Sequence, residues 1–289
     1  MNSTAVRRFS VQRMDTAAVK RFADEVAVEE PLEIRVAYQF KEARVAESFA
    51  VTMRTPGHDR ELAAGLLYSE GMLHSVDDLL DLRMLGNTAD AGSNEILAEL
   101  GPGVEADMPA LARRGYVNSS CGVCGKRTRE AVWQSIPRLP NNSLEIAWPD
   151  IANLPQRLRE RQQDFARTGG LHAAALVDRG GNIEVVFEDI GRHNALDKLI
   201  GYCLLESRLP VSNRLIFMSS RSSFELVQKA LMAGCPVLAT VGGPSSLAIE
   251  MAREHDLTLL GFFREGHCNV YSGERRLNSR VYEAAPSRE

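Results

Sequence analysis

The strongest constraint on the fold is a regular alternation of apolar strand-like segments and helical segments between residues 214 and 263. The expected strands are Arg214 to Met218, Val237 to Val241 and Leu257 to Phe263, and the expected helices are Ser223 to Ala233 and Ser246 to Glu254. Apolar strands that alternate with helices are typical of a parallel sheet covered on both faces. Ser222 and Glu225 match a capping box at the first helix start. This stretch predicts an α/β domain.

In a parallel sheet, the turns that follow these strands all lie along one edge. They are Ser219-Ser220-Arg221-Ser222, Gly242-Gly243-Pro244-Ser245 and Arg264-Glu265-Gly266-His267. Ligands of open α/β sheets bind beyond the carboxyl ends of the strands. Helix-start amides, serine hydroxyls, Arg221 and Arg264 suit this edge to phosphate groups, although turns rich in glycine and serine also serve as plain connectors.

The stretch SSCGVCGK at residues 119–126 carries two thiols three positions apart, Cys121 and Cys124. Five cationic residues flank the pair: Arg113, Arg114, Lys126, Arg127 and Arg129. Nearby cations favour the thiolate, which is the nucleophilic form of cysteine. The pair therefore indicates sulfur chemistry. Half of a zinc site is the alternative interpretation. The other cysteines provide no second close pair for a four-cysteine site, but a mixed site of cysteine and histidine stays open.

Composition narrows the class of protein. The chain has 289 residues, of which 44% are hydrophobic and 25% charged, enough for two cores of ordinary globular type. A formal net charge of −4 argues against general nucleic-acid binding. No signal peptide and no apolar run of about 18 residues is visible, so we expect a cytoplasmic protein without a membrane anchor. Five cysteines without a secretion signal fit a reducing compartment.

The N-terminal part predicts a small α+β domain of the β-grasp kind at residues 30–110, preceded by a flexible arm at residues 1–29. Its expected elements are a hairpin of Leu32 to Phe40 and Ser48 to Arg54, a helix capped by Asp59, and short strands at Leu82 to Leu85 and Glu95 to Leu100. Residues 111–145 are expected to form the cysteine-bearing loop and a linker. The α/β domain is then expected at residues 146–289.

The start of this second domain predicts one helix from Asp150 to Phe165 and strands at His172 to Asp178 and Ile183 to Phe187. The turn that follows holds Asp189, Arg192 and His193, ahead of a helix. These three groups bind an anion or handle protons, or else they form a capping and salt-bridge cluster. Both interpretations stay open. A histidine at the start of an apolar strand, as at His172, is more often a core residue than a ligand.

With these motifs in hand, the sequence resembles the formate dehydrogenase accessory sulfurtransferase family (FdhD/NarQ). The resemblance covers nearly everything after residue 29. Its markers are the SSCGVCGK stretch, HAAA at 172–175, FEDIGRHNALDKLIG at 187–201, SSRSSFELVQKA at 219–230 and GFFREGHCNVY at 261–271. The resemblance implies a larger domain with a three-layer fold like that of cytidine deaminases.

It also implies a function, in which the protein takes sulfur from a cysteine desulfurase and delivers it to the molybdenum cofactor of formate dehydrogenase. Cys121 corresponds to the persulfide carrier, and Cys124 resolves the persulfide or shields it. Phe262 to His267 match the segment for the bis(molybdopterin guanine dinucleotide) cofactor, a bound substrate that guanosine diphosphate partly mimics. A homodimer and contact with the formate dehydrogenase catalytic subunit are expected, and no resident metal. The turns at the sheet edge are expected to contact the same cofactor. Together, the expected cofactor contacts are Ser219, Ser220, Arg221, Gly242, Gly243, Phe262, Phe263, Arg264, Glu265, Gly266 and His267.

Two other functions are open to a direct test against the sequence. Zinc deaminases need HxE followed by PCxxC, but His172-Ala173-Ala174 lacks the glutamate and the cysteine pair precedes the histidine. A working deaminase is therefore not expected. A non-catalytic chaperone of the molybdenum cofactor keeps the phosphate-binding edge and gives Cys121 no covalent role. Detection of a persulfide on the protein distinguishes the chaperone from the sulfurtransferase.

Overall fold

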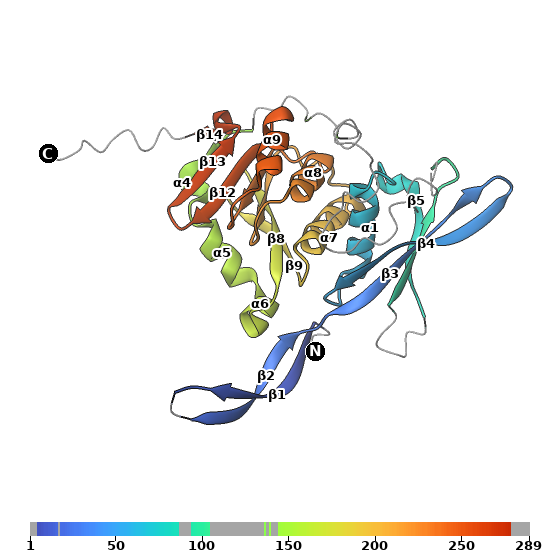
Figure 1. Cartoon of the computed structure of the whole chain (residues 1–289). Coiled ribbons are helices and arrows are strands. Elements are labelled where there is room, and N and C mark those ends of the chain that lie inside the picture. Colours follow the sequence, from blue (N-terminus) through green and yellow to red (C-terminus); the bar gives the residue numbers. More distant parts are fainter. Residues whose placement is uncertain are drawn as a thin grey trace. The chain divides into compact units, whose positions relative to one another are not determined.

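The computed structural model describes residues 5–16, 18–86, 94–104, 136, 139 and 144–278. The chain divides into two compact units that interleave along the sequence (Figure 1). Unit 1 comprises Met1–Thr128, Gln162–Ala173 and Phe187–Ser207, and unit 2 comprises Arg129–Arg161, Ala174–Val186 and Arg208–Glu289. Segment 187–207, which we expected within the domain at 146–289, therefore belongs to unit 1.

Unit 1 begins with a two-stranded hairpin of β1 (Val6–Met14) and β2 (Val19–Ala27). We expected an arm without regular structure here, and the strands were missed because both of their faces are mostly polar and exposed. Glu25 of β2 accepts hydrogen bonds from Arg167 of α6 (Gln163–Thr168) at 2.9 Å and from Arg8 at 3.0 Å. These bonds, first that of Arg167, lower the pKa of Glu25 to about 2, so the carboxylate stays charged at any physiological pH.

The main sheet of unit 1 has a strand order compatible with the expected β-grasp arrangement. The strands β3 (Glu30–Phe40), β4 (Ala43–Arg54), β5 (Leu79–Leu85) and β6 (Glu95–Leu100) form a sheet in the order β4-β3-β6-β5. Strands β3 and β6 are parallel, and the other pairs are antiparallel. Helix α1 (Asp59–Ser69) packs on β5 and β6, with a 3₁₀ turn at Val76–Asp78 before β5. The capping residue is His58 and not Asp59, whose carboxylate pairs with Arg54 Nε at 2.8 Å.

Helix α7 (Arg192–Leu205) also belongs to unit 1 and touches α1 backbone to backbone. A Cβ atom on Gly65 of α1 would lie 1.8 Å from the carbonyl oxygen of Asp197, and one on Gly201 of α7 would lie 1.8 Å from that of Glu61. Beside this contact, the Ser69 hydroxyl donates to the Asp197 carboxylate at 3.0 Å. Only glycine at both positions permits the two helices to approach this closely.

The larger sheet has six strands: β8 (His172–Asp178), β9 (Ile183–Asp189), β10 (Arg214–Met218), β11 (Val237–Thr240), β12 (Thr258–Arg264) and β13 (His267–Ser272). Their order is β13-β12-β11-β10-β8-β9. Strands β10, β11 and β12 are parallel, as predicted. Strands β8 and β13 run antiparallel to their neighbours β10 and β12, so the whole sheet is mixed.

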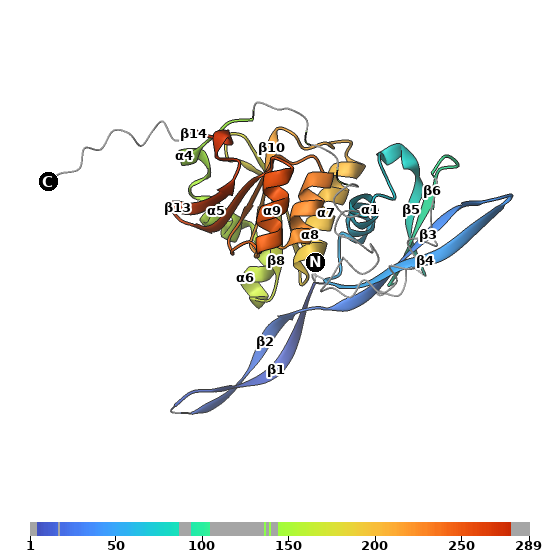
Figure 2. The same cartoon turned by 45° about the horizontal axis from the view of Figure 1, so that its top comes forward.

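Within unit 2 the sheet is the middle of three layers. Figure 2 shows α8 (Phe224–Met232) and α9 (Ser246–Glu254) side by side on one face, with α4 (Trp148–Ile151) and α5 (Leu154–Arg161) on the other. Short strands β7 (Ile146–Ala147) and β14 (Leu277–Asn278) pair in parallel, with a 3₁₀ turn at Glu274–Arg276 before β14. No helix in the described part of the chain is long and apolar enough to cross a membrane.

The single helix expected from Asp150 to Phe165 is wrong. It is divided into α4, α5 and α6, because Pro155 supplies no amide hydrogen and Gln162, at φ −84° and ψ 80°, leaves the helical conformation. The capping box expected at α8 is also absent. The Ser222 hydroxyl bonds the hydroxyl of Thr240 at 2.8 Å, and Ser223 is the residue that precedes the helix.

The contact between α1 and α7 is open to a direct test. Gly65→Ala or Gly201→Ala should lower the free energy of unfolding by about 3 kcal/mol or more, because the added methyl group meets a fixed backbone carbonyl. Gly103→Ala is the matched control, since a Cβ atom there meets nothing within 4 Å. Urea unfolding of the three variants measures the difference. Equal midpoints for Gly65→Ala and Gly103→Ala would contradict the close approach.

Candidate functional site

The carboxyl ends of β10, β11 and β12 stay bonded to one another beyond the sheet. The amide of Val241 donates to Met218 O at 3.0 Å, that of Gly242 to Ser220 O at 2.9 Å, and that of Phe262 to Gly242 O at 3.0 Å. The turn residues Ser219–Ser222, the turn residues Gly242–Ser245 and Phe262 therefore form one continuous edge. We call this set the turn edge.

The buried hydroxyls of the turn edge hold it together. The Ser222 hydroxyl bonds that of Thr240, whose oxygen also lies 3.0 Å from Gly242 O and 3.2 Å from Leu260 O. The Ser220 hydroxyl donates to Arg221 O at 3.1 Å. Because Ser220 and Ser222 are buried, these two hydroxyls stabilise the edge from inside, contrary to our expectation that they lie at its surface.

Two glycines allow side chains to pack closely against the backbone at the centre of the turn edge. A Cβ atom on Gly242 would lie 2.6 Å from Cγ of Arg221, and one on Gly243 would lie 2.6 Å from Cζ of Phe262. The stem of Arg221 therefore rests on Gly242, and the ring of Phe262 rests on Gly243. Both side chains are exposed, Phe262 with 47% of its surface. A planar ring and a guanidinium thus flank two adjacent glycines.

The two neighbouring phenylalanines have opposite environments. Phe262 has a positive φ of 50°, in a region where the β12 and β13 pairing shifts between Gly261 and Arg264. Phe263 is fully buried, with its ring centroid 5.3 Å from that of Phe217 and 5.5 Å from that of Trp148. Of the two, only Phe262 presents its ring at the surface, whereas Phe263, which we also expected among the cofactor contacts, packs in the core.

The two arginines of the site also differ. Arg264 donates from Nη1 to the carbonyl oxygens of Val241, at 2.5 Å, and Phe263, at 3.0 Å. It therefore fastens β12 to the turn after β11. Arg221 is exposed and forms no ion pair within the residues that the structure describes. Arg221 is the cation of the turn edge that is available to an anionic ligand.

The remaining expected contacts lie in the turn between β12 and β13. Glu265, Gly266 and His267 are exposed, and Gly266 has a positive φ of 78°. Sequence reasoning missed β13, because its alternation is weak and its outer residues are exposed. The antiparallel pair Arg264 and His267 closes this hairpin. Leu260 is the last residue of β12 that pairs with β11, and the hairpin extends β12 beyond this residue.

In unit 1, Asp189 is the centre of a buried network. Its carboxylate lies 2.8 Å from Lys198 Nζ, and the two side chains are 0% and 1% exposed. It also accepts hydrogen bonds from the amides of Thr55 at 3.1 Å and Gly191 at 2.8 Å, and from Asn194 Nδ2 at 3.1 Å. Every carboxylate oxygen is thus occupied. Of the two open interpretations, the salt-bridge cluster holds for Asp189.

Lys198 is equally satisfied, because it donates to Thr55 O at 2.9 Å and to Glu188 O at 3.2 Å. Arg192 and His193 are half-buried and take no part in this ion pair. The pKa of His172 is lowered, first by burial and then by the positive charges of Arg192 and His193. The His172 imidazole is therefore neutral at pH 7.

Cys121 and Cys124 lie outside the described residues. Among the cysteines that are described, Cys203 and Cys235 are buried and Cys268 is half-buried. Burial raises the pKa of the Cys268 thiol to about 11, so it holds almost no thiolate at neutral pH. The described part of the chain contains no group of three or more histidine, cysteine and acidic side chains placed to hold a metal ion.

Comparison with known proteins decides the family. A family model described as FdhD/NarQ matches residues 27–278. The chain belongs to this family. Its match confirms the resemblance drawn from the motifs, and it spans the turn edge, the Asp189 network and the cysteine pair.

Named relatives of the FdhD/NarQ family align over almost the whole chain. "Sulfur carrier protein FdhD" of Streptomyces avermitilis is 45% identical over 286 residues, which cover 96% of this chain and 97% of the relative. The protein of the same name from Saccharolobus solfataricus is 39% identical over 272 residues, with coverage of 94% and 98%.

A solved structure supports the fold of this FdhD/NarQ member. It is the crystal structure of a proposed formate dehydrogenase accessory protein from Desulfotalea psychrophila, with a TM-score of 0.74 and 19% sequence identity. The likeness covers 95% of this chain and 100% of that one. The expected α/β fold is thereby confirmed.

The Asp189 network generates a stability prediction. Lys198→Met should lower the free energy of unfolding by about 3–5 kcal/mol, because it leaves the Asp189 carboxylate buried without its partner. Arg192→Ala, on the same helix, should cost well under about 1 kcal/mol. The double variant Asp189→Leu with Lys198→Met should recover part of the loss. Urea unfolding measures all four proteins, and similar losses in Lys198→Met and Arg192→Ala would refute the structural role.

Proposed function

We propose that this protein is a sulfur carrier that accepts persulfide sulfur on Cys121 and delivers it to the molybdenum cofactor of formate dehydrogenase. The family match carries the proposal, because residues 27–278 include the CGVC pair and relatives of similar length are named sulfur carrier proteins. The name of the structural neighbour points to formate dehydrogenase. A cysteine desulfurase is the proposed donor and the catalytic subunit of formate dehydrogenase the proposed recipient, with the protein acting as a cytoplasmic homodimer.

The first step is an exchange between sulfur atoms. The Cys121 thiolate attacks the terminal sulfur of the donor's cysteine persulfide, a new S–S bond forms on Cys121, and the donor cysteine leaves as a thiolate. Nothing is oxidised or reduced overall. The cations that flank the pair in sequence favour this step, because they hold more of the Cys121 sulfur as thiolate.

Cys124 lies three residues after Cys121, close enough in sequence to release the carried sulfur. Its thiolate attacks Cys121 Sγ, the terminal sulfur leaves as hydrosulfide, and a Cys121–Cys124 disulfide forms. The two thiols supply the two electrons that turn the carried sulfur into sulfide. A cellular dithiol must then reduce the disulfide. Shielding of the persulfide by Cys124, without attack, is the alternative role.

The turn edge is the proposed place for the guanine dinucleotide part of the cofactor. The two adjacent glycines let the Phe262 ring and the stem of Arg221 lie directly against the backbone, so an aromatic ring and a guanidinium are held next to one another. A guanine base stacks on an aromatic ring, and a phosphate accepts charge-assisted hydrogen bonds from arginine. The helix α9, which Ser245 caps at 3.3 Å, points its N-terminal amides toward the same edge.

Persulfide formation tests the carrier role. After incubation with a cysteine desulfurase and cysteine, the wild-type protein should gain one sulfur atom on Cys121, detected by mass spectrometry of its peptides. Cys121→Ala should gain none and should fail to activate formate dehydrogenase, because the chemistry needs this sulfur. Cys268 is the internal control, since a thiol with a pKa of about 11 should stay unmodified at pH 7.5.

Cys124→Ala separates the roles of the second cysteine. If Cys124 resolves the persulfide, this variant should accumulate the Cys121 persulfide and release little sulfide. Activation of formate dehydrogenase by Cys121→Ala would instead favour a non-catalytic chaperone. Complete loss of persulfide in both variants, together with bound zinc by metal analysis, would favour a metal site.

Nucleotide binding tests the turn edge. Guanosine diphosphate should bind the wild-type protein in calorimetry. Arg221→Ala should weaken binding by about 1.5–3 kcal/mol for each lost charge-assisted hydrogen bond, and Phe262→Ala by about 1–3 kcal/mol through lost stacking. Arg264→Ala should also weaken binding, because it loosens the turn that Arg264 fastens.

Arg253→Ala is the matched control for this experiment. Arg253 is an exposed arginine in the last turn of α9, at the opposite end of that helix from the turn edge. Its loss should leave nucleotide affinity unchanged. Absence of binding to the wild type, or unchanged affinity in both Arg221→Ala and Arg264→Ala, would place the cofactor elsewhere and leave the sulfur-transfer half of the proposal intact.

A further inference from the structure

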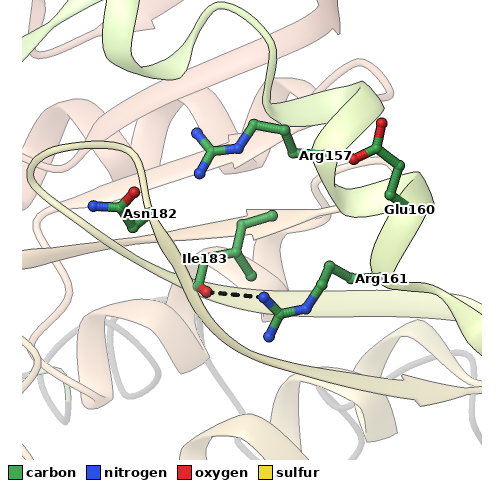
Figure 3. A pocket seen from close by; sticks show the side chains of 5 residues that line it. All are labelled: Arg157, Glu160, Arg161, Asn182 and Ile183. Atoms are coloured by element: carbon green, nitrogen blue, oxygen red, sulfur yellow. Dashed lines mark hydrogen bonds between the residues drawn. The ribbon is translucent and has the colours of Figure 1, made fainter.

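A cavity in unit 2 lies between α5 and the turn that joins β8 to β9. It has a volume of about 290 Å³. Figure 3 shows the five residues that line it: Arg157, Glu160, Arg161, Asn182 and Ile183. Two of the five are arginines, in a chain whose formal net charge is −4.

The cavity lies at the end of the sheet opposite the turn edge. In the antiparallel pairing of β8 with β10, Asp178 lies beside Arg214, where β10 begins, whereas the turn edge follows Met218, where β10 ends. The turn after Asp178 therefore lies at the end of the sheet where β10 begins, opposite the turn edge. A ligand in this cavity is distinct from one on the turn edge.

The two arginines are neighbours on one face of α5. Arg157 and Arg161 are four residues apart, and like charges at this spacing destabilise a helix. Figure 3 shows the Arg157 guanidinium extending toward Asn182, while Arg161 donates to Ile183 O at 3.3 Å. Neither forms an ion pair with any residue that the structure describes. An anion between them would replace their repulsion by attraction.

The nearby carboxylates are already engaged. Glu160 accepts a hydrogen bond from Gln156 Nε2 at 3.1 Å, and Figure 3 shows it on the side away from the Arg157 guanidinium. Asp178 accepts from the amide of Asn182 at 2.8 Å and from its Nδ2 at 3.0 Å. Burial acts to raise the pKa of Asp178, but these bonds and the charge of Arg157 hold it below its usual value.

We propose that this cavity binds a phosphate group, held by the guanidinium groups of Arg157 and Arg161. Arginine is suited to this role because its planar donors match the oxygens of a phosphate in pairs. The cavity is larger than one phosphate ion, so it also accommodates the carbon skeleton of a small phosphomonoester. The site goes beyond the proposed sulfur transfer and does not depend on it.

The test uses the full-length Arg221→Ala variant, in which the turn edge has lost its available cation. Inorganic phosphate, glycerol 3-phosphate and sulfate are titrated in separate calorimetric runs, and the backbone amides of Asn182 and Ile183 are followed by NMR. We expect phosphate to shift these two amides. We also expect glycerol 3-phosphate to bind more tightly than inorganic phosphate, since it fills more of the cavity.

Substitutions in α5 then locate the ligand. Arg157→Ala and Arg161→Ala should each weaken phosphate binding about tenfold or more. Arg159→Ala is the matched control, because Arg159 is on the same short helix and does not line the cavity. Its loss should change the affinity less than about twofold.

Several outcomes would overturn the proposal. They are absence of phosphate binding to the Arg221→Ala variant, amide shifts confined to the turn edge, unchanged affinity in Arg157→Ala and Arg161→Ala, or an equal loss in Arg159→Ala, which would indicate only the general charge of α5. Persulfide formation and guanosine diphosphate binding should remain normal in Arg157→Ala with Arg221 intact. Failure of this site is therefore distinguishable from failure of the proposed function.

Discussion

The buried ion pair of Asp189 and Lys198 is the constraint on which unit 1 depends. It joins the end of β9, the middle of α7 and Thr55, which follows β4. A carboxylate and an ammonium group that are buried away from water destabilise the fold unless they pair and form all of their hydrogen bonds. Few other arrangements of these segments are therefore possible. Because α7 begins where Asp189 holds it, Gly201 arrives opposite α1 at a distance that only glycine tolerates. The polar network therefore fixes the register in which the two helices pack.

The regular part of the fold follows from sequence pattern to within a residue or two. Strands β6, β8 and β10 and helix α9 begin and end where the apolar runs predict, because these elements are buried along their length or carry a continuous apolar face. The hairpin of β1 and β2 was missed for the opposite reason. Its faces are polar, and its attachment comes from Glu25 and Arg167, which are 142 positions apart. No local pattern reports an ion pair between residues so distant in sequence.

The sequence predicted which edge of the sheet carries the candidate site, but not which side chains of that edge face outward. Parallel strands bring Arg221, Gly242 and Phe262 to one edge, and the topology confirms that expectation. Which of two adjacent phenylalanines faces outward was not predictable, because it depends on a shift in the pairing of β12 with a strand that sequence did not reveal. The Ser222 hydroxyl is turned inward for a similar reason, since its buried partner, Thr240, is 18 residues away in sequence.

The conformation of Phe262 sets stability against the proposed base stacking at a single position. A bulky residue with φ of 50° is in a region that side chains avoid, at a cost of about 1–2 kcal/mol, and the same conformation keeps its ring at the surface. Glycine would relax the strand and remove the ring. Laboratory selection for heat resistance alone would therefore be expected to favour glycine at position 262, and a thermostable variant obtained in this way would lack the exposed ring on which the proposed base stacking depends.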